Sequence, residues 1–118
     1  MVINQGDIFW VYLEMPLESE PGFRHPFVVI QNNIVNHSRL GTVILCALTS
    51  NLKRAVIANN VLLAPGEGNL EQQSVVNVTQ IITVDRAQLG DYIGSLSSKR
   101  VRQILDGIQV ILEPLEPA

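Results

Sequence analysis

Short apolar runs alternate along the chain with polar segments rich in glycine and proline. The runs DIFWVYL (7–13), PFVVIQ (26–31) and TVILCALT (42–49) contain many β-branched and aromatic residues, which predicts three strands. Proline is tolerated at the first residue of a strand, so we expect Pro26 to begin the second one. Arg24 and His25 then lie just outside it and face water, a partner or a substrate.

The second half of the chain continues this pattern up to residue 85. NVLLA (60–64) and QSVVNV (73–78) predict two strands joined as a hairpin by PGEGNL, and TQIITVD (79–85) continues in extended conformation. In AQLGDYIGSL (87–96), glycines are expected to interrupt the sheet.

Apolar residues at three- and four-residue spacing after residue 100 predict an amphipathic helix, with Ser97 or Ser98 as its N-cap and Pro114 beyond its end. The fold class expected from this order is mainly β (α+β): a small, strongly twisted antiparallel sheet or partial barrel closed by a C-terminal helix. With 118 residues the chain is predicted to form a single domain, 1–118.

Composition narrows the class of protein further. A hydrophobic content of 47% argues against a disordered chain, and no apolar run has the length of a membrane span. The first residues lack the pattern of a signal peptide, so we expect a cytoplasmic protein. Cys46 is the only cysteine, which gives no zinc spacing and is typical of a small core residue.

Charge is distributed unevenly along the chain. The formal net charge is −3, yet no Asp or Glu lies between Pro21 and Gly66, where Arg24, Arg39, Lys53 and Arg54 are found. A buried sheet, which needs few charges, is one explanation. The other is a positive surface that binds phosphate groups.

Arg24 and Thr49 are candidates for chemistry on a phosphate. An arginine side chain offers a fork of donors that matches phosphate oxygens, although an ion pair with Glu18 or Glu20 is an equally good local explanation for Arg24. Thr49 and Ser50 end the third predicted strand, and pairing with the second strand brings their hydroxyls towards that strand. Hydrogen bonds from these hydroxyls to nearby backbone are the alternative.

The two histidines, His25 and His37, invite comparison with a ribonuclease that uses histidines as acid and base. His37 is more simply a solvent-exposed residue. The sequence has no metal-ligand spacing, no glycine-rich phosphate loop that opens a helix and no Gly-x-Ser-x-Gly elbow, which disfavours nucleotide hydrolases and serine hydrolases.

The order QGDIFWVYL, PGFRHPFVVIQNN, TVILCALTSNL, VTQIITVDRAQL and a closing helix resembles the MazF/PemK family of toxin endoribonucleases, over about residues 6–112. The resemblance implies a small SH3-like barrel, a homodimer, and a functional pair that matches Arg24 and Thr49. That family usually has arginine directly before the proline, whereas His25 separates them here. Either the strand start is shifted by one residue or His25 adds a titrating group.

The resemblance further implies cleavage of single-stranded RNA by the ribose 2′-hydroxyl, without metal or cofactor. Arg24 would stabilise the charged phosphorus centre, Thr49 would orient a nonbridging oxygen, and Glu20 or His25 would assist as base or acid. The implied partners are RNA and a cognate antitoxin with an acidic, disordered tail. The expected RNA contacts are Asn32, Ser50, Lys53 and Arg54.

Two alternatives remain at this point. Toxins that resemble the CcdB proteins share this fold but bind DNA gyrase through the end of the C-terminal helix and do no chemistry. That end, VILEPLEPA, lacks the aromatic residue that such binding favours. A degenerate member that binds RNA or antitoxin without cutting is the other possibility.

Overall fold

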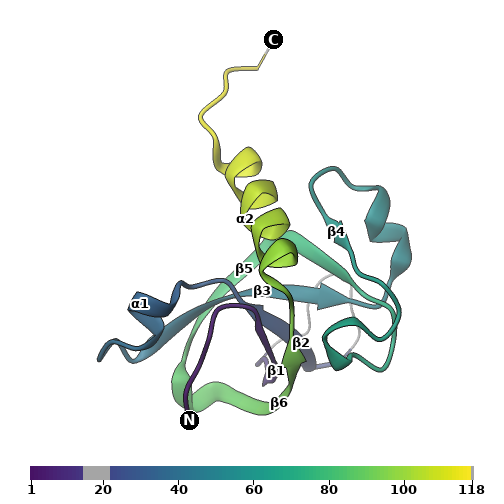
Figure 1. The fold of residues 1–118 in the computed structure, drawn as a ribbon. Helices are drawn as coiled ribbons and strands as arrows, with labels where there is room; N and C mark the ends of the chain where they lie inside the picture. Colours follow the sequence, from purple (N-terminus) through teal and green to yellow (C-terminus); the bar gives the residue numbers. More distant parts are fainter. Residues whose placement is uncertain (15–21, 118) are drawn as a thin grey trace.

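One antiparallel sheet of six strands, in the order β4–β5–β3–β2–β1–β6, forms the body of the protein, and α2 packs on it (Figure 1). The computed structural model describes residues 1–14 and 22–117. The elements are β1 Asp7–Tyr12, β2 Arg24–Val29, α1 Asn33–Asn36, β3 Thr42–Thr49, β4 Val61–Leu62, β5 Val75–Asp85, β6 Leu89–Ser95 and α2 Ser98–Leu112, with 3₁₀ turns η1 Leu52–Val56, η2 Glu67–Asn69 and η3 Arg86–Gln88.

The predicted fold class is confirmed: the protein is mainly β, with an open, curved sheet and one long C-terminal helix. β5 bends strongly where its pairing with β3 changes register, since Cys46 lies opposite Ile81 but Ala47 lies opposite Asn77. Extra residues in one strand of a pair bend it and increase its twist. The bend lets one sheet curl around its own core.

Buried apolar side chains form a separate cluster on each face of the sheet. One contains Ile8, Val28 and Leu48, and helix α2 contributes Ile104 and Ile108 to it. The other cluster, lined by the alternate strand residues, includes Phe9, Phe27 and Leu45. Successive side chains of a strand point to opposite faces, so neighbouring residues of β2 belong to different clusters.

The prediction for residues 87–96 was wrong, because this segment forms strand β6 and pairs with β1. Its glycines permit close approach of backbone rather than breaking the strand. A Cβ at Gly90 would lie 2.7 Å from the carbonyl oxygen of Trp10, and one at Gly94 would collide with the carbonyl of Gly68. Such contacts between distant segments are absent from any local pattern.

The start of β2 also differs from the prediction. Arg24 and His25 lie inside the strand, opposite Tyr12 and Val11 of β1. Pairing with β3 begins only at Phe27, so the missing N–H of Pro26 interrupts no hydrogen bond on that side. The first two residues of β2 therefore lie at the sheet's end with one side unpaired.

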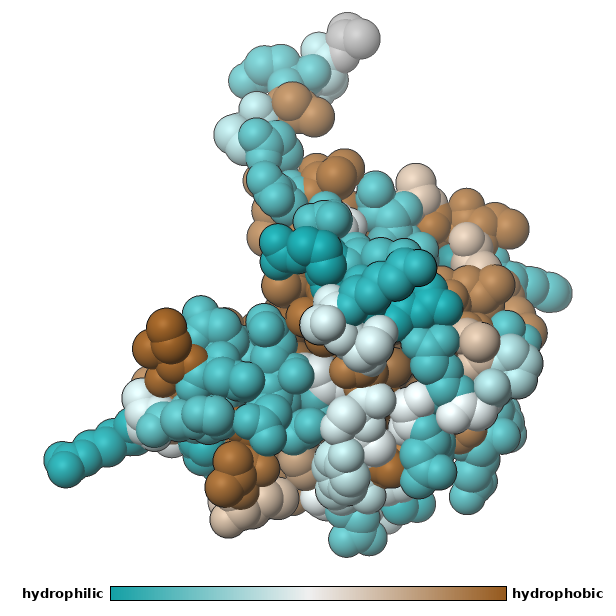
Figure 2. Space-filling view, in the orientation of Figure 1, coloured by the Kyte–Doolittle hydropathy of each residue, from teal (hydrophilic) through white to brown (hydrophobic). Residues whose placement is uncertain are grey.

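Helix α2 begins as predicted, with Ser97 as N-cap, whose hydroxyl accepts from the N–H of Arg100. Figure 2 shows apolar surface beside α2, over the segment of η1 and β4. Within the described residues, no helix combines the length and apolarity that a bilayer crossing requires.

Cys46 is confirmed as a core residue. Its thiol is fully buried and donates to the carbonyl oxygen of Asn77 over 3.2 Å. Burial raises the pKa of this thiol to about 12, so it stays protonated and is a poor nucleophile at neutral pH.

Candidate active site

A cavity of about 420 Å³ lies where the first residues of β2, the end of β3 and the loop before β5 meet. A volume of this size is in the usual range for a small ligand. Both members of the predicted functional pair line it. The complete lining is Trp10, Arg24, His25, Pro26, Leu48, Thr49, Ser50, Asn69, Leu70, Glu71, Gln72, Ser74, Tyr92 and Ile93.

Arg24 is exposed, and its side chain is held by an aromatic ring. The guanidinium carbon lies 4.0 Å from the ring centroid of Trp10, a cation–π contact. The strand register supports this contact, because Trp10 lies opposite Pro26 and is therefore diagonal to Arg24 on the same face. Stacking on the ring leaves the N–H edges of the guanidinium available to an anion. The alternative partners Glu18 and Glu20 lie outside the described residues.

Thr49 is buried at the end of β3, and its hydroxyl makes the backbone hydrogen bond considered from the sequence. Its Oγ1 accepts from the backbone N–H of Asn51 over 3.1 Å, yet the residue also lines the cavity. Because Oγ1 is already an acceptor on that side, the hydroxyl hydrogen remains free to donate. Ser50, which follows it, is exposed and lines the same cavity.

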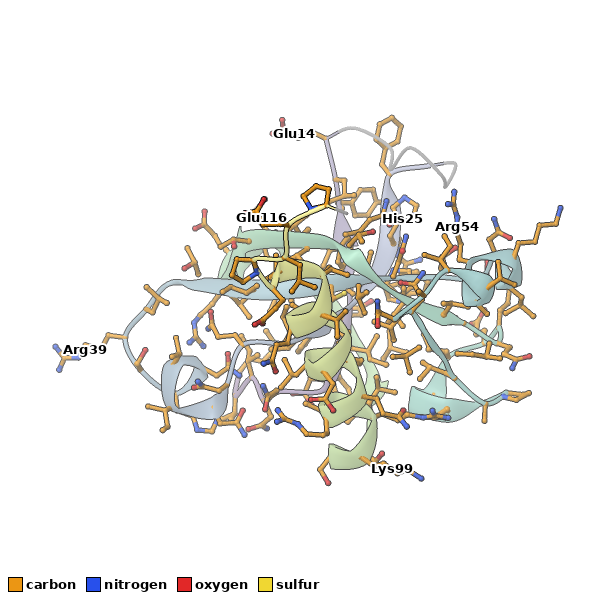
Figure 3. The ribbon with its side chains drawn as sticks, turned by 90° about the horizontal axis from the view of Figure 1, so that it is seen from above. Glu14, His25, Arg39, Arg54, Lys99 and Glu116 are labelled. Atoms are coloured by element: carbon orange, nitrogen blue, oxygen red, sulfur yellow. The ribbon has the colours of Figure 1, made fainter. Side chains whose placement is uncertain are left out.

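Only 5% of His25 is exposed, so of the three expected surroundings it does not face bulk water; it lines the cavity, where a substrate would lie. Nε2 lies 2.9 Å from the carbonyl oxygen of Gly22, which can only accept, so Nε2 carries the hydrogen of this bond. Figure 3 shows His25 at the start of β2, where this bond holds the chain that leads into Arg24.

The other predicted residues are not gathered in the cavity. Asn32 lies beyond the opposite end of β2 and caps α1, where its side chain accepts from the N–H of Val35. Lys53 and Arg54 belong to η1, which follows Thr49 closely, but they do not line the cavity. His37 does not line the cavity, and its Nε2 lies 2.9 Å from Oδ1 of Asn4. Glu20 lies outside the described residues.

Sequence reasoning missed the wall formed by the loop 69–72. PGEGNL (65–70) was interpreted as a hairpin turn, and only the fold shows that residues 69–72 line the cavity. Leu70 is buried, and the side-chain amide of Asn69 donates to the carbonyl oxygen of Ile93 in β6. The one available signal was four polar residues in succession, Glu71 to Ser74, directly before strand β5.

An ion pair ties the start of η2, just before this loop, to the first turn of α2. Arg100 donates to both carboxylate oxygens of Glu67, over 2.8 and 3.0 Å, and both side chains are about one quarter exposed. The hydrogen bonds from Arg100 hold the pKa of Glu67 below its ordinary value. The helix thus positions one wall of the cavity.

Arg100→Gln should lower the free energy of unfolding by about 1 kcal/mol at pH 7. A carboxyl whose pKa is depressed in the folded state stabilises it above the ordinary value, 4.5 for Glu67, and this contribution is lost as the pH falls through the lower folded pKa. The difference between wild type and variant should therefore shrink below pH 4.5 in urea titrations. Arg102→Gln is the control, since Arg102 and Asp106 are exposed and 4.0 Å apart. A difference that does not change with pH would contradict this account.

Comparisons with known proteins identify the family and the fold. Residues 4–112 match the family described as PemK-like, MazF-like toxin of type II toxin–antitoxin system. The chain is 37% identical over 113 residues to endoribonuclease MazF6 of Mycobacterium tuberculosis, covering 96% of this chain and 99% of that protein. It is 30% identical over 112 residues to endoribonuclease EndoA of Bacillus subtilis, covering 95% and 96%.

Solved structures share the fold. A mycobacterial endoribonuclease in complex with its cognate antitoxin superposes with a TM-score of 0.77 at 22% identity, over 98% of this chain and 99% of that one. MazF from Deinococcus radiodurans gives a TM-score of 0.74 at 19% identity, over 95% and 97%. These similarities extend over nearly the whole length of each protein.

Proposed function

This chain belongs to the family of PemK-like, MazF-like toxins of type II toxin–antitoxin systems, and we propose that it is a sequence-specific endoribonuclease that cleaves single-stranded RNA. The observation that carries the proposal is the meeting of Arg24 and Thr49, from adjacent strands, in one cavity. The relatives named above are endoribonucleases, and the gyrase-binding alternative gains no support from them.

The proposed reaction is an attack of the ribose 2′-hydroxyl on the adjacent phosphorus. The O2′–P bond forms, the P–O5′ bond breaks, and the products carry a 2′,3′-cyclic phosphate and a 5′-hydroxyl. Arg24 donates to the nonbridging oxygens as negative charge builds on phosphorus, while the Thr49 hydroxyl donates to one of them. Since the nucleophile belongs to the substrate, the protein supplies charge stabilisation and proton transfer, and we propose that it needs no metal.

Proton transfer is assigned to Glu20 or His25, as the sequence suggested. For His25 the structure supports a second task, because its bond to Gly22 holds the start of β2 beside Arg24. The two tasks predict different behaviour in variants.

His25→Gln should retain most of the activity and leave its pH profile unchanged, because an amide N–H still reaches towards the Gly22 carbonyl. His25→Ala removes this donor and should lower the free energy of unfolding by about 1–2 kcal/mol, together with activity. Initial rates between pH 5 and 9, with thermal melts of both variants, measure this. If His25→Gln loses one limb of the pH profile, the imidazole is the acid or base.

The proposal extends to partners and cellular location. RNA and the acidic tail of a cognate antitoxin would compete for the surface between Pro21 and Gly66, which carries no Asp or Glu. Lys53 and Arg54 are the proposed cationic contacts, with Ser50 beside them. We further propose that residues 1–118 act as one domain, that two copies form a homodimer, and that the toxin acts in the cytoplasm on mRNA.

Incubation of the purified protein with a long, unstructured RNA in EDTA tests this function, with Arg24→Ala in parallel. Discrete fragments that end in 2′,3′-cyclic phosphate, absent with the variant, are expected. Cleavage that requires a divalent metal would refute the mechanism. Binding without cleavage of several RNAs would favour the degenerate member instead.

A further inference from the structure

The cavity has two charged walls of opposite sign. Arg24 lines it from the sheet, and Glu71 lines it from the loop 69–72. These side chains do not pair with each other: within residues 1–14 and 22–117 the ion pairs join Glu67 with Arg100 and Arg102 with Asp106. Glu71 is exposed to solvent and therefore available to a ligand.

A carboxylate repels the phosphates of RNA. A carboxylate beside the phosphate-binding arginine therefore favours binding only if it contacts another part of the substrate. In single-stranded RNA, the unstacked bases present their Watson–Crick edges to the protein. A carboxylate only accepts hydrogen bonds. It therefore selects bases by their N–H donors and disfavours edges dominated by acceptors.

Guanine matches this acceptor best among the four bases. Its Watson–Crick edge offers N1–H and an N2 amino N–H side by side, which fit the two oxygens of one carboxylate. Adenine and cytosine each present one amino group next to an acceptor nitrogen, and uracil presents one N–H between two carbonyl oxygens. A charge-assisted pair of parallel hydrogen bonds is stronger and more directional than any of these single bonds.

The rest of the loop wall suits a base that inserts between the two charges. Leu70 and Ile93 provide apolar lining for the faces of a ring, while Asn69 is tied to β6 and the loop is tied to α2 through Glu67. A reading group gains specificity when its support is fixed before the ligand binds. Glu71 follows directly after the buried anchor Leu70.

We propose that Glu71 accepts paired hydrogen bonds from a guanine next to the scissile phosphate, and so sets one position of the cleavage sequence. This inference rests on the proposed function and names a specificity that neither Arg24 nor Thr49 supplies. It makes Glu71 a base-reading residue, separate from the groups that act on the phosphate.

The test combines cleavage mapping with a substrate lacking one donor. Long RNA is transcribed with guanosine or with inosine, which retains N1–H but lacks the N2 amino group, and is cleaved by wild type, Glu71→Gln and Glu116→Gln. Wild type should cut at sites with guanine at one fixed position and lose about tenfold or more in rate on inosine RNA. Glu71→Gln should cut both RNAs at similar rates, whereas Glu116→Gln, altered in the exposed C-terminal segment, should match wild type.

Binding of short oligonucleotides blocked by 2′-O-methyl groups gives a second measurement that does not depend on cleavage. Wild type should bind the guanosine oligonucleotide about tenfold more tightly than the inosine one, and Glu71→Gln should show no difference. If RNA is cleaved without guanine at a fixed position, or Glu71→Gln still discriminates, the inference fails while the ribonuclease stands. If Glu71→Gln loses cleavage of all sequences equally, Glu71 acts in the chemical step and base reading is refuted. If nothing is cleaved, the proposed function fails, and equal binding of both oligonucleotides overturns this inference as well.

Discussion

Arg24→Ala is expected to lower the rate constant of RNA cleavage by about 10³-fold or more. The guanidinium is the cation that the described residues bring into the cavity beside Thr49, and the phosphorane-like transition state carries more charge on its oxygens than the substrate does. Removal of a group aimed at such charge costs about 10²–10³ for a single neutral donor and up to about 10⁵ for an arginine. Single-turnover rates with excess enzyme measure this loss directly.

Arg24→Lys and Arg39→Ala complete the experiment. Lysine keeps the charge but loses the planar fork and the stacking on Trp10, so an intermediate loss of about 10–100-fold is expected. Arg39 is exposed and lies far from His25 in Figure 3, so its removal should leave the rate near that of wild type. The cation–π contact contributes only about 0.5–1 kcal/mol, and Arg24→Ala should melt close to wild type. Full activity of Arg24→Ala would exclude this cavity as the site of cleavage.

The local sequence predicted the position of a strand correctly where that strand is buried on both faces. The run TVILCALT forms β3 with the predicted bounds. Its dense β-branched and aliphatic residues are typical of a strand that packs against apolar side chains on both faces. Strand β6 was missed for the opposite reason. Its glycines look like breaks, and the backbone contacts that require them, from Gly68 and from Trp10, are made by segments far away in the sequence.

Some residues of the candidate site were likewise predictable from the sequence, and others were not. Arg24 and Thr49 were predictable, because neighbouring strands tend to pair and the family resemblance names an arginine and a threonine at these strand ends. The burial of His25 was not predictable, since it depends on two residues of β2 that pair with β1 beyond the proline. The role of Glu71 was not predictable either, because its loop is anchored by residues far away in the sequence: Asn69 donates to Ile93, and Glu67, just before the loop, binds Arg100.

The structure explains why one segment of the chain has no acidic residues. The residues between Pro21 and Gly66 include β2, β3 and η1, so a segment without carboxylates supplies one side of the cavity and the adjoining surface. The opposite wall comes from later sequence and contains Glu71. A uniformly positive groove would bind RNA without regard to sequence. One carboxylate at the far wall adds the repulsion that a selective site needs.

Thr49→Val should lower the rate constant of cleavage by about 10²-fold, the second largest effect we expect. Valine has nearly the same shape as threonine, so the buried position stays filled, but the hydroxyl that we propose donates to a nonbridging oxygen is gone. The variant also leaves the N–H of Asn51 without its side-chain acceptor, which should cost about 1 kcal/mol of stability. Single-turnover rates and urea titrations measure the two losses separately.

Phosphorothioate substrates show whether the lost hydroxyl acted on the phosphate or only on the turn. Sulfur accepts hydrogen bonds poorly, so wild type should cleave one phosphorothioate diastereomer more slowly than the other, and Thr49→Val should lose most of this preference. Thr49→Ser retains the hydroxyl and should restore both rate and preference, while Thr83→Val, at an exposed position on β5, should resemble wild type. A variant that is slow but keeps the wild-type preference would show that Thr49 supports the backbone after β3 without touching the substrate.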